Sequence, residues 1–432
     1  MNMNNGDGRA RRILIVAIEE GRWGPARLPN CLEAAGFRVA ALCPARNPLA
    51  ATRYIDRFYP LCRSRSSLRL AKSIGDAITS WRPHLVVPAD EQVVVLLQAL
   101  VRQGASPGGL NAEALAVIVD SLGRPDRFDA MLLKSETIAL AHQVGVPTPL
   151  SRTVASAEEA VTAADTIGYP VYLKKSFSWA GNGIALCHGA ADIHDAMRPP
   201  RRWLATLKSM VRRILHRDWY PAATATDVQQ VIAGTPAMYS CVARNGVLLA
   251  GFAGMKRQTI TPTGPSTVVQ LGPHAEMARA AGVMVRALGA TGFLAFDFLI
   301  EETTGRALLL ECNPRPNQVG HLGDRVGADL AKALAAGESD HAIEPDRERL
   351  ITLFPQEWLA QRRAETAAGS ETDVPCDDPK LFAFMLRAIG RKWGRTRFGR
   401  DAQPLRIAME PRFAAANRKA QPAGPNGAIV IG

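Results

Sequence analysis

The chain has 432 residues, and its hydrophobic fraction of 47% and charged fraction of 21% are ordinary for a globular protein. This length is sufficient for two or three domains that share a continuous core. No apolar run approaches the roughly 20 residues that cross a bilayer, and residues 13–18 are too short for the core of a signal peptide. The seven cysteines form no Cys-x-x-Cys pair, so we expect reduced thiols in a cytoplasmic protein.

The positive charge is concentrated in two segments. Residues 196–217 and residues 379–400 each hold seven Lys or Arg and no acid, a total of +14, so the other residues sum to −2 of the net +12. A nearly neutral body with two basic segments argues against a nucleic-acid-binding fold. It favours two local contact surfaces instead.

Short apolar strands alternate with helices in the first part of the chain. The predicted strands are residues 12–17, 37–42 and 83–88. This alternation predicts a parallel sheet covered on both faces. Asp90 and Glu91 follow the third strand, where such sheets place ligands. A pair of acids stabilised by the dipole of a helix N-terminus explains them equally well.

The middle of the chain changes to a mixed pattern. A helix begins at Lys134 and leaves through Val-Pro-Thr-Pro, and a second helix near residues 156–167 has Ser156 as its N-cap. Further strands are predicted at residues 170–174, 184–187, 228–232, 238–243, 247–252, 293–300 and 307–311. The turn at Asn245-Gly246 predicts a hairpin. After about residue 345 we expect helices, and residues 401–432, rich in Ala, Pro and Gly, are expected to be disordered.

The pair of strands at residues 293–313 carries the sharpest functional signal. Asp297 interrupts an otherwise apolar strand, and a turn at Thr304-Gly305 returns the chain to Glu311 and Asn313. Alternation of side chains places Glu311 and Asn313 on one face, with Asp297 near them. Acids in apolar strands are unfavourable without a partner. We therefore expect a Mg²⁺ (or Mn²⁺) site rather than a solvated cross-strand pair, because Mg²⁺ prefers oxygen ligands.

A lysine at the end of another apolar strand gives a weaker signal. Lys174 is followed by a loop of small residues that includes Ser176, Gly181 and Gly183. Such a loop can bind phosphate through the lysine charge and its backbone N–H groups, although glycine-rich hairpins without a ligand are equally common. The Walker pattern is absent from this stretch.

These features, in this order, resemble the ATP-grasp superfamily. The resemblance extends over residues 10–330, and the ending Glu-x-Asn-Pro-Arg-Pro at Glu311–Pro316 is similar to the carbamoyl-phosphate-synthetase and amino-acid-ligase branches. It implies a fold of mixed α/β and α+β class, with a pre-ATP-grasp parallel α/β domain followed by the two-subdomain ATP-grasp fold. The expected domains are residues 10–125, residues 126–345 with a basic helical insertion at 196–217, a helical C-terminal extension at 346–400, and the tail.

The resemblance also implies roles for individual residues. Lys134 and Lys174 would contact the ATP phosphates, and Ser176, Gly181 and Gly183 would cover them. The hinge residues Gln229, Gln230 and Ile232 would bind adenine. The metal ligands would be Asp297, Glu311 and Asn313, while Arg315 and Lys174 would act on the transferring phosphoryl group and Arg257 on a substrate carboxylate.

Two positions depart from the family pattern. Gln229 stands where relatives often have an acid, and Pro236 stands where others place a ribose-binding acid. Asp227 is a candidate to compensate.

The function implied by the resemblance is ligation. ATP would convert a carboxylate into an acyl phosphate for attack by an amine or a thiol, with release of ADP and phosphate. One alternative is an ATP-binding module of weak or no activity that docks to a partner. A carboxylating or carbamoyl-phosphate-forming enzyme is less favoured, since the chain has neither a second copy of the domain nor a biotin-carrier Met-Lys-Met.

The two basic segments each predict an amphipathic helix. Their apolar residues share the offsets 0, 4, 7 and 11 and are Trp203, Leu207, Met210 and Ile214, then Phe382, Leu386, Ile389 and Trp393. Such stripes usually pack on the protein body with the arginines in solvent. The alternative is peripheral contact with an anionic membrane or a carrier protein. Neither segment has the aromatic and basic interleaving of a single-strand nucleic-acid platform.

Overall fold

The computed structural model describes most of the chain. The described residues are 11–61, 66–105, 110–176, 183–198, 210–211, 213–214, 219, 225–260, 264–337, 341–360, 369–395, 405–408 and 428–431.

A four-stranded parallel sheet forms the N-terminal part, as the sequence predicts. Its strands β1 (Arg12–Val16), β2 (Arg38–Cys43), β3 (Arg57–Pro60) and β4 (Leu85–Pro88) lie in the order β3-β2-β1-β4. Alternate residues of β1 enter two different cores, which explains its uninterrupted apolar sequence. The associated helices are η1 (Gly24–Arg27), α1 (Leu28–Ala34), η2 (Pro48–Ala51), α2 (Ser67–Trp81), α3 (Glu91–Gln103) and α4 (Ala112–Leu122).

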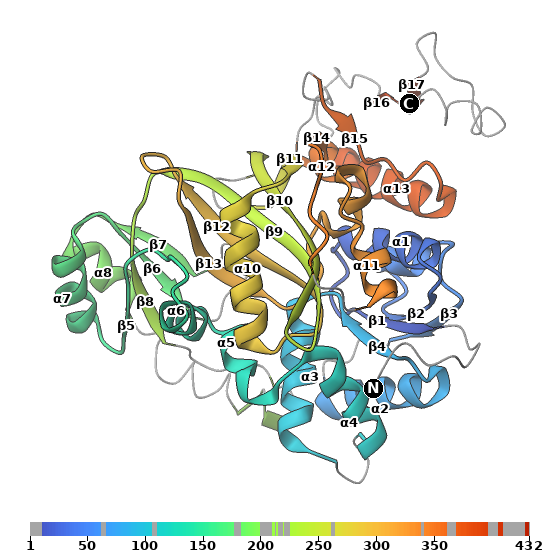
Figure 1. The fold of residues 1–432 in the computed structure, drawn as a ribbon, viewed down its shortest axis with the longest axis horizontal. Helices are drawn as coiled ribbons and strands as arrows, with labels where there is room; N and C mark the ends of the chain where they lie inside the picture. The colour runs from blue at the N-terminus through green and yellow to red at the C-terminus, as the bar shows by residue number, and fades with distance from the viewer. Residues whose placement is uncertain are drawn as a thin grey trace.

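A small antiparallel sheet stands apart on the left of Figure 1. Its strands β5 (Ser151–Val154), β6 (Val171–Lys175), β7 (Ile184–Cys187) and β8 (Thr226–Gln230) lie in the order β5-β8-β6-β7. Helices α7 (Ala157–Ile167) and α8 (Ala190–Ala196) cover one face and enclose a separate small core with it. The helices η3 (Pro125–Arg127), α5 (Phe128–Leu132) and α6 (Lys134–Gln143) connect this subdomain to the N-terminal part.

A seven-stranded sheet forms the centre of the molecule. Its order is β13-β12-β9-β10-β11-β14-β15. The strands are β9 (Gly234–Arg244), β10 (Val247–Thr259), β11 (Ser266–Gly272), β12 (Gly292–Glu301), β13 (Ala307–Asn313), β14 (Arg349–Thr352) and β15 (Glu371–Thr372). The predicted hairpin joins β9 to β10, with Asn245 and Gly246 at positive φ. The expected α/β and α+β organisation is confirmed.

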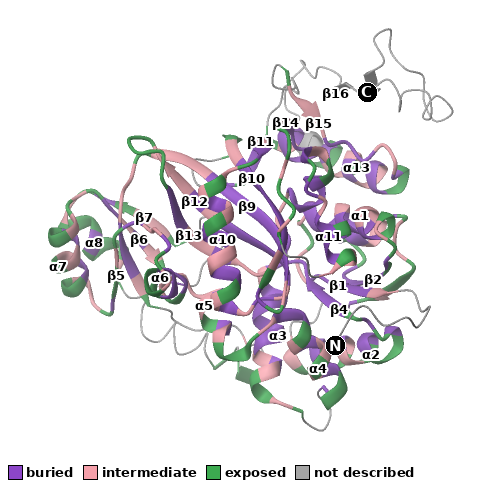
Figure 2. Ribbon diagram, in the orientation of Figure 1, coloured by how far each residue is buried: buried purple, intermediate pink, exposed green. Residues whose placement is uncertain are grey.

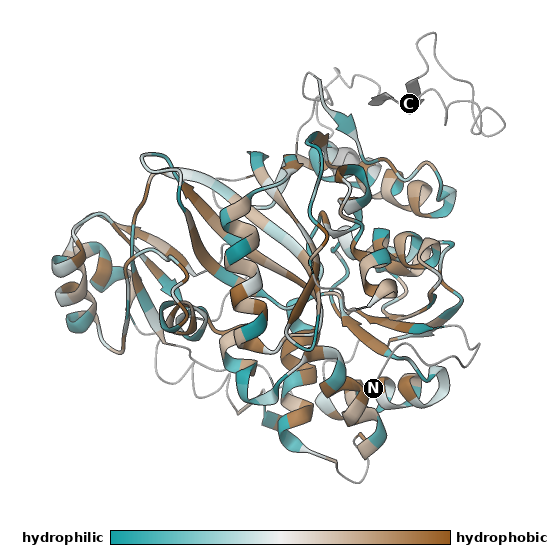
Figure 3. Cartoon of the chain, in the orientation of Figure 1, coloured by the Kyte–Doolittle hydropathy of each residue, from teal (hydrophilic) through white to brown (hydrophobic). Residues whose placement is uncertain are grey.

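Both faces of the central sheet are covered. Helix α10 (Ala275–Leu288) crosses one face, and α11 (Leu330–Ala336) lies with η4 (Gly320–Val326) between the other face and the N-terminal sheet (Figure 1). Tyr239 and Cys241 of β9 enter one core, while Met238 and Val242 enter the other. Figure 2 shows β9 and β10 buried, and Figure 3 shows strongly hydrophobic stretches along the same sheet. Both cores also contain residues of the N-terminal sheet, so the boundary near residue 125 stays a prediction.

The region after residue 345 is less helical than expected. Besides α12 (Gln356–Ala360) and α13 (Pro379–Arg395), it supplies β14 and β15 to the central sheet. These strands are too short for a period of two to reveal them. In the tail that we expected to be disordered, β16 (Leu405–Ala408) pairs with β17 (Ala428–Ile431), two short apolar runs within an Ala/Pro/Gly-rich composition.

The basic helix α13 packs through its apolar stripe. Phe382 and Ile389 are buried against the N-terminal part, whereas Lys380, Arg387 and Arg391 are exposed. The packing interpretation is therefore confirmed for this segment, as far as its side chains are described. The described part of the chain contains no helix long and apolar enough to span a bilayer. Its six cysteines are free thiols.

Asp378 links α13 to the N-terminal part. Its carboxylate accepts hydrogen bonds from the N–H groups of Leu381 and Arg53, each at 3.1 Å, and from the Thr52 hydroxyl. We expect Asp378→Ala to lower the free energy of unfolding by about 2–3 kcal/mol, since it removes a helix cap and leaves a buried hydroxyl unpaired. Urea unfolding measures this effect. Asp346→Ala, which removes an exposed ion pair, is the control expected to leave stability nearly unchanged. An equally small change for Asp378→Ala would mean that the apolar stripe alone holds α13.

Candidate functional site

Two acidic side chains face each other across the β12–β13 hairpin. Asp297 pairs in register with Glu311, and Ala295 pairs with Asn313. A bulge interrupts the register between Asp297 and Phe298, where Leu310 is the extra residue on β13. The bulge lets Leu310 line a pocket on one side while the next residue, Glu311, lines a second pocket. The predicted meeting of Asp297, Glu311 and Asn313 on one hairpin is thus observed.

The carboxylates of Asp297 and Glu311 share a hydrogen bond. Burial and the neighbouring Glu311 raise the pKa of Asp297, and Lys256 opposes this rise. Burial also acts to raise the pKa of Glu311, but Lys134, whose Nζ lies 2.9 Å from Glu311 Oε2, together with Asp297 and Lys174 holds it well below its usual value. Two carboxyl groups in this position need a proton or a cation between them.

This donor set fits a hard divalent cation. Asn313 Nδ2 lies 3.4 Å from Glu311 Oε1, so the amide belongs to the same cluster. No set of three His, Cys, Asp or Glu side chains arranged to hold a metal occurs among the described residues. A cation here would therefore take two carboxylates, the Asn313 oxygen, and water or phosphate oxygens, which is the usual environment of Mg²⁺.

The small sheet presents a polar face towards this hairpin. Lys174 Nζ donates a hydrogen bond to Gln229 Oε1, and Gln229 Nε2 donates to Ser151 Oγ at 2.9 Å. The Lys174 ammonium also lies 5.6 Å from the centre of the Tyr172 ring. Burial lowers the pKa of Lys174 to about 8, although Glu311 acts to raise it. Gln229 stands where relatives often have an acid. As an amide it provides no negative charge that would oppose the lowering of the Lys174 pKa by burial.

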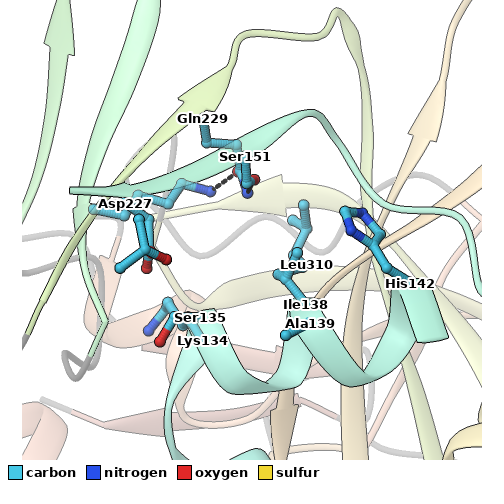
Figure 4. A pocket seen from close by; sticks show the side chains of 11 residues that line it. Lys134, Ser135, Ile138, Ala139, His142, Ser151, Asp227, Gln229 and Leu310 are labelled. Carbon is cyan, nitrogen blue, oxygen red and sulfur yellow. Dashed lines mark hydrogen bonds between the residues drawn. The ribbon is translucent and has the colours of Figure 1, made fainter. Parts of the chain in front are cut away.

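A pocket lies between this polar face, α6 and β13. Figure 4 shows Lys134 and Ser135 at one end of α6, His142 at the other end, and Asp227 and Gln229 opposite this helix. Asp227 is almost fully buried, and it accepts a hydrogen bond from Thr153 Oγ1 at 2.7 Å through one carboxylate oxygen. The pocket is lined by Lys134, Ser135, Ile138, Ala139, His142, Ser151, Thr153, Lys174, Asp227, Gln229 and Leu310.

The loop and hinge candidates occupy the edges of this pocket. Ser176 is buried, and its carbonyl and hydroxyl accept hydrogen bonds from the N–H groups of Lys134 (2.9 Å) and Ser135 (3.1 Å), so it fixes the start of α6. Gly183 has a positive φ and closes the loop onto β6, whereas Gly181 lies outside the described residues. The Gln230 N–H donates to Leu150 O at 2.9 Å. Residue 232 follows the end of β8 instead of lying within it as expected.

Arg315 contacts the N-terminal part of the molecule. Its Nη2 forms an ion pair with Glu91, the first residue of α3, and lies 3.3 Å from Asn313 Oδ1. Glu91, Asn313 and Arg315 line the second pocket together with Val94, Met131, Leu132, Lys134, Thr137, Glu311, Cys312 and Pro314. The sequence places Glu91 at the end of a strand, but it does not indicate this partner.

Arg257, the candidate for a substrate carboxylate, lies away from the carboxylate hairpin. It is exposed, and its Nε donates to Gln270 Oε1 at 3.0 Å on the face of β10 opposite Lys256. Lys256, and more weakly Arg315, oppose the raised pKa of Asp297. A bulge in the β10–β11 pairing follows Lys256, and such an irregularity is not visible in the sequence. Lys256 is thus the cation of β10 that faces the carboxylates, while the contact of Arg257 with a substrate carboxylate stays a prediction.

Part of this chain is similar in sequence to known proteins. Residues 134–213 match the family described as the ATP binding domain of the carbamoyl-phosphate synthase L chain. The carbamoyl phosphate synthase large chain of Ralstonia nicotianae is 26% identical over 268 residues, which are 59% of this chain and 23% of that protein. The chain therefore spans about a quarter of the length of this relative.

Solved structures share the fold. The biotin carboxylase of Campylobacter jejuni, described as a β-γ-ATP complex, aligns with a TM-score of 0.58 and 16% identity over 79% of this chain and 75% of that one. N5-carboxyaminoimidazole synthetase from Staphylococcus aureus aligns with a TM-score of 0.54 and 11% identity, over 79% and 81% of the two chains. The shared fold, together with the family match over the lysine-bearing segment, supports the resemblance of this chain to the ATP-grasp superfamily.

Proposed function

We propose that this protein is an ATP-dependent ligase that activates a carboxylate for attack by an amine or a thiol. One observation carries the proposal. Glu311, which is hydrogen-bonded to Asp297, lines one pocket and Lys174 lines another, while Lys134 lines both pockets and pairs with Glu311. Two neighbouring carboxylates can bind a divalent cation, and the two lysines next to them can bind phosphates. Together these groups can bind a nucleoside triphosphate with its metal ion.

ATP would lie between the small sheet and β13. The backbone groups of Gln230 and Ile232 at the hinge would bind adenine, and Gln229 would stay bonded to Lys174. Lys134 and Lys174 would contact the phosphates, with the loop of Ser176, Gly181 and Gly183 above them. Pro236 has no carboxylate with which to bind the ribose. We propose that Asp227, which lines the pocket, binds the ribose instead.

Asp297, Glu311 and Asn313 would hold Mg²⁺ (or Mn²⁺), which when bound neutralises phosphate charge. Lys174 and Arg315 would stabilise the negative charge that develops as the γ-phosphoryl group moves to the substrate carboxylate. The phosphoryl group supplies a better leaving group than oxide, so the acyl phosphate can be attacked by an amine or thiol. Arg257 would attract the substrate carboxylate, and Lys256, which faces Asp297, is a second candidate for this role.

The relatives support this class of reaction. The sequence relatives are named carbamoyl phosphate synthases, and the structural neighbours include biotin carboxylase and N5-carboxyaminoimidazole synthetase. Since these names describe different acids and acceptors, they do not select the substrates of this chain. The experiment must distinguish this ligase from the alternative, a module that binds ATP without turnover.

The experiment combines nucleotide binding with product identification. Purified protein is mixed with Mg²⁺-ATP and pools of carboxylic acids and amines, ADP is followed with time, and products are identified by mass spectrometry. Substrate-stimulated ADP release with a new amide or thioester supports the ligase. Tight ATP binding without ADP release from any pool supports the binding module, and no ATP binding contradicts both.

Residues 196–217 are a second candidate contact surface. Met210, Val211 and Ile214 are exposed, unlike the apolar stripe of α13, and the segment carries seven cationic residues and no acid. The other residues of its expected stripe, Trp203 and Leu207, lie outside the described residues. We propose peripheral contact with an anionic membrane, since cationic helices with exposed apolar residues bind such surfaces.

Vesicle flotation tests this contact. We expect the protein to float with vesicles containing anionic lipid, to lose most of this binding at high salt, and not to float with zwitterionic vesicles. A Met210→Ser/Ile214→Ser variant is expected to remain at the bottom. The matched control is Leu150→Ser/Leu186→Ser, which removes two other exposed apolar side chains. Equal flotation of the two variants, or none for the original protein, contradicts the proposal.

A further inference from the structure

The N-terminus of α3 is fixed on the edge of the parallel sheet. Asp90 caps this helix, and its buried carboxylate accepts hydrogen bonds from the N–H groups of Ile18 (2.7 Å), Glu19 (2.9 Å) and Val93 (3.0 Å). All the described contacts of the Asp90 carboxylate are thus to the protein backbone. Glu91 follows Asp90 as the first residue of α3, so the capped helix fixes the backbone position of Glu91.

Glu91 divides its carboxylate between two arginines. One oxygen forms an ion pair with Arg315 Nη2, and the other lies 3.1 Å from Arg22 Nη2. Arg22 is held in turn by Glu19, 2.7 Å from its Nε. The side chains of Glu91 and Arg315 are only 15% and 13% exposed. Solvent therefore screens this pair far less than an ordinary surface pair.

Arg315 extends this chain of contacts to the metal-binding candidates. It lies 3.3 Å from Asn313 Oδ1, and Asn313 lies 3.4 Å from Glu311, so these two contacts are long. The Nε of Arg315 is buried without a hydrogen-bond partner among the described residues. The ion pair with Glu91 is accordingly the strongest contact that orients the guanidinium.

We propose that Glu91 is a positioning residue that holds Arg315 against the Asp297–Glu311 site. Helix α3 would then contribute to phosphoryl transfer indirectly, through the contact of Glu91 with Arg315. Only the kinetic part of this inference rests on the proposed function. An interdomain ion pair with a purely structural role is the competing explanation.

A double-mutant cycle followed by both ADP release and thermal unfolding separates the two explanations. We expect Glu91→Gln to lower the rate of substrate-stimulated ADP release about 10-fold to 100-fold, the usual effect of losing a group that orients a reacting side chain. The ATP concentration for half-maximal rate is expected to stay unchanged. In an Arg315→Gln background, Glu91→Gln should have no further effect, because Glu91 acts through Arg315. A purely structural ion pair instead predicts that each single variant lowers the melting temperature, while the rate of the folded protein stays unchanged.

Glu113→Gln is the matched control. Glu113 is also an acid in the first turn of a capped helix, but it is exposed on α4. A crystal structure of the Glu91→Gln variant tests whether Glu91 positions Arg315, and this test does not require a measurement of enzymatic activity. Displacement of the Arg315 guanidinium from Asn313 supports it, and an unmoved guanidinium overturns it. If the original protein binds no ATP, the proposed function fails while this structural result still stands.

Discussion

Replacing Glu311 with Gln is expected to reduce the rate of substrate-stimulated ADP release by more than about 100-fold. Loss of a residue that only supports a metal ligand typically lowers activity by at most about 100-fold. Glu311 has three partners in the structure, since it shares a hydrogen bond with Asp297, pairs with Lys134 and lies beside Asn313. Gln keeps the shape of the side chain but removes its charge. One metal ligand is weakened, and Lys134 loses the anion that orients it. A discontinuous ADP assay over a range of Mg²⁺ concentrations measures the effect, and extra Mg²⁺ should restore only part of the rate.

Glu302→Gln provides the matched control for this variant. It makes the same substitution on the same hairpin, at an exposed position beyond the end of β12. We expect the rate and the Mg²⁺ dependence of this control to equal those of the original protein. A Glu311→Gln variant that melts at the normal temperature and keeps more than half of the rate would contradict the assignment of Glu311 as a metal ligand.

The carboxylate hairpin was predictable because its information is local. Apolar strands with a single acid, a Thr-Gly turn and a period of two are sufficient to predict the hairpin and to bring Asp297 near Glu311. Their pairing in register depends in addition on the bulge at Leu310. The parallel sheet was predictable for the same reason, since its strands are short, apolar and separated by helices. Resemblance to a family added the roles of the lysines, which spacing alone does not supply.

Long-range pairing and strand irregularities limited the rest of the prediction. Glu91 and Arg315 are 224 residues apart, and no periodic pattern connects them. The bulge at Leu310 brings Asp297 into register with Glu311, but it leaves no trace in the alternation of residues. Strands β14 and β15 complete a sheet whose other strands lie far earlier in the chain. Such short edge strands depend on tertiary packing more than on their own sequence.

Lys174 gives the second prediction, a loss of ATP affinity at alkaline pH. Burial lowers its pKa to about 8, so the ammonium is protonated at pH 7 and mostly neutral above pH 9. Phosphate binding favours the charged form, so ATP must bind together with a proton once the free protein has lost it. The affinity for Mg²⁺-ATP should therefore be constant below about pH 8 and fall by at most about tenfold per pH unit above it. Calorimetric titration between pH 6.5 and 9.5 measures this.

Three variants identify Lys174 as the group that titrates. Lys174→Met should weaken Mg²⁺-ATP binding at pH 7 by about 10-fold to 100-fold, as expected for one lost charge-assisted hydrogen bond, and should abolish the decline above pH 8. Gln229→Glu places a carboxylate against Lys174, which raises the pKa of the lysine and moves the decline to higher pH. Lys175→Met is the control, since that side chain is exposed on the opposite face of β6. An unchanged pH profile in the Gln229→Glu variant would mean that a group other than Lys174 governs the decline.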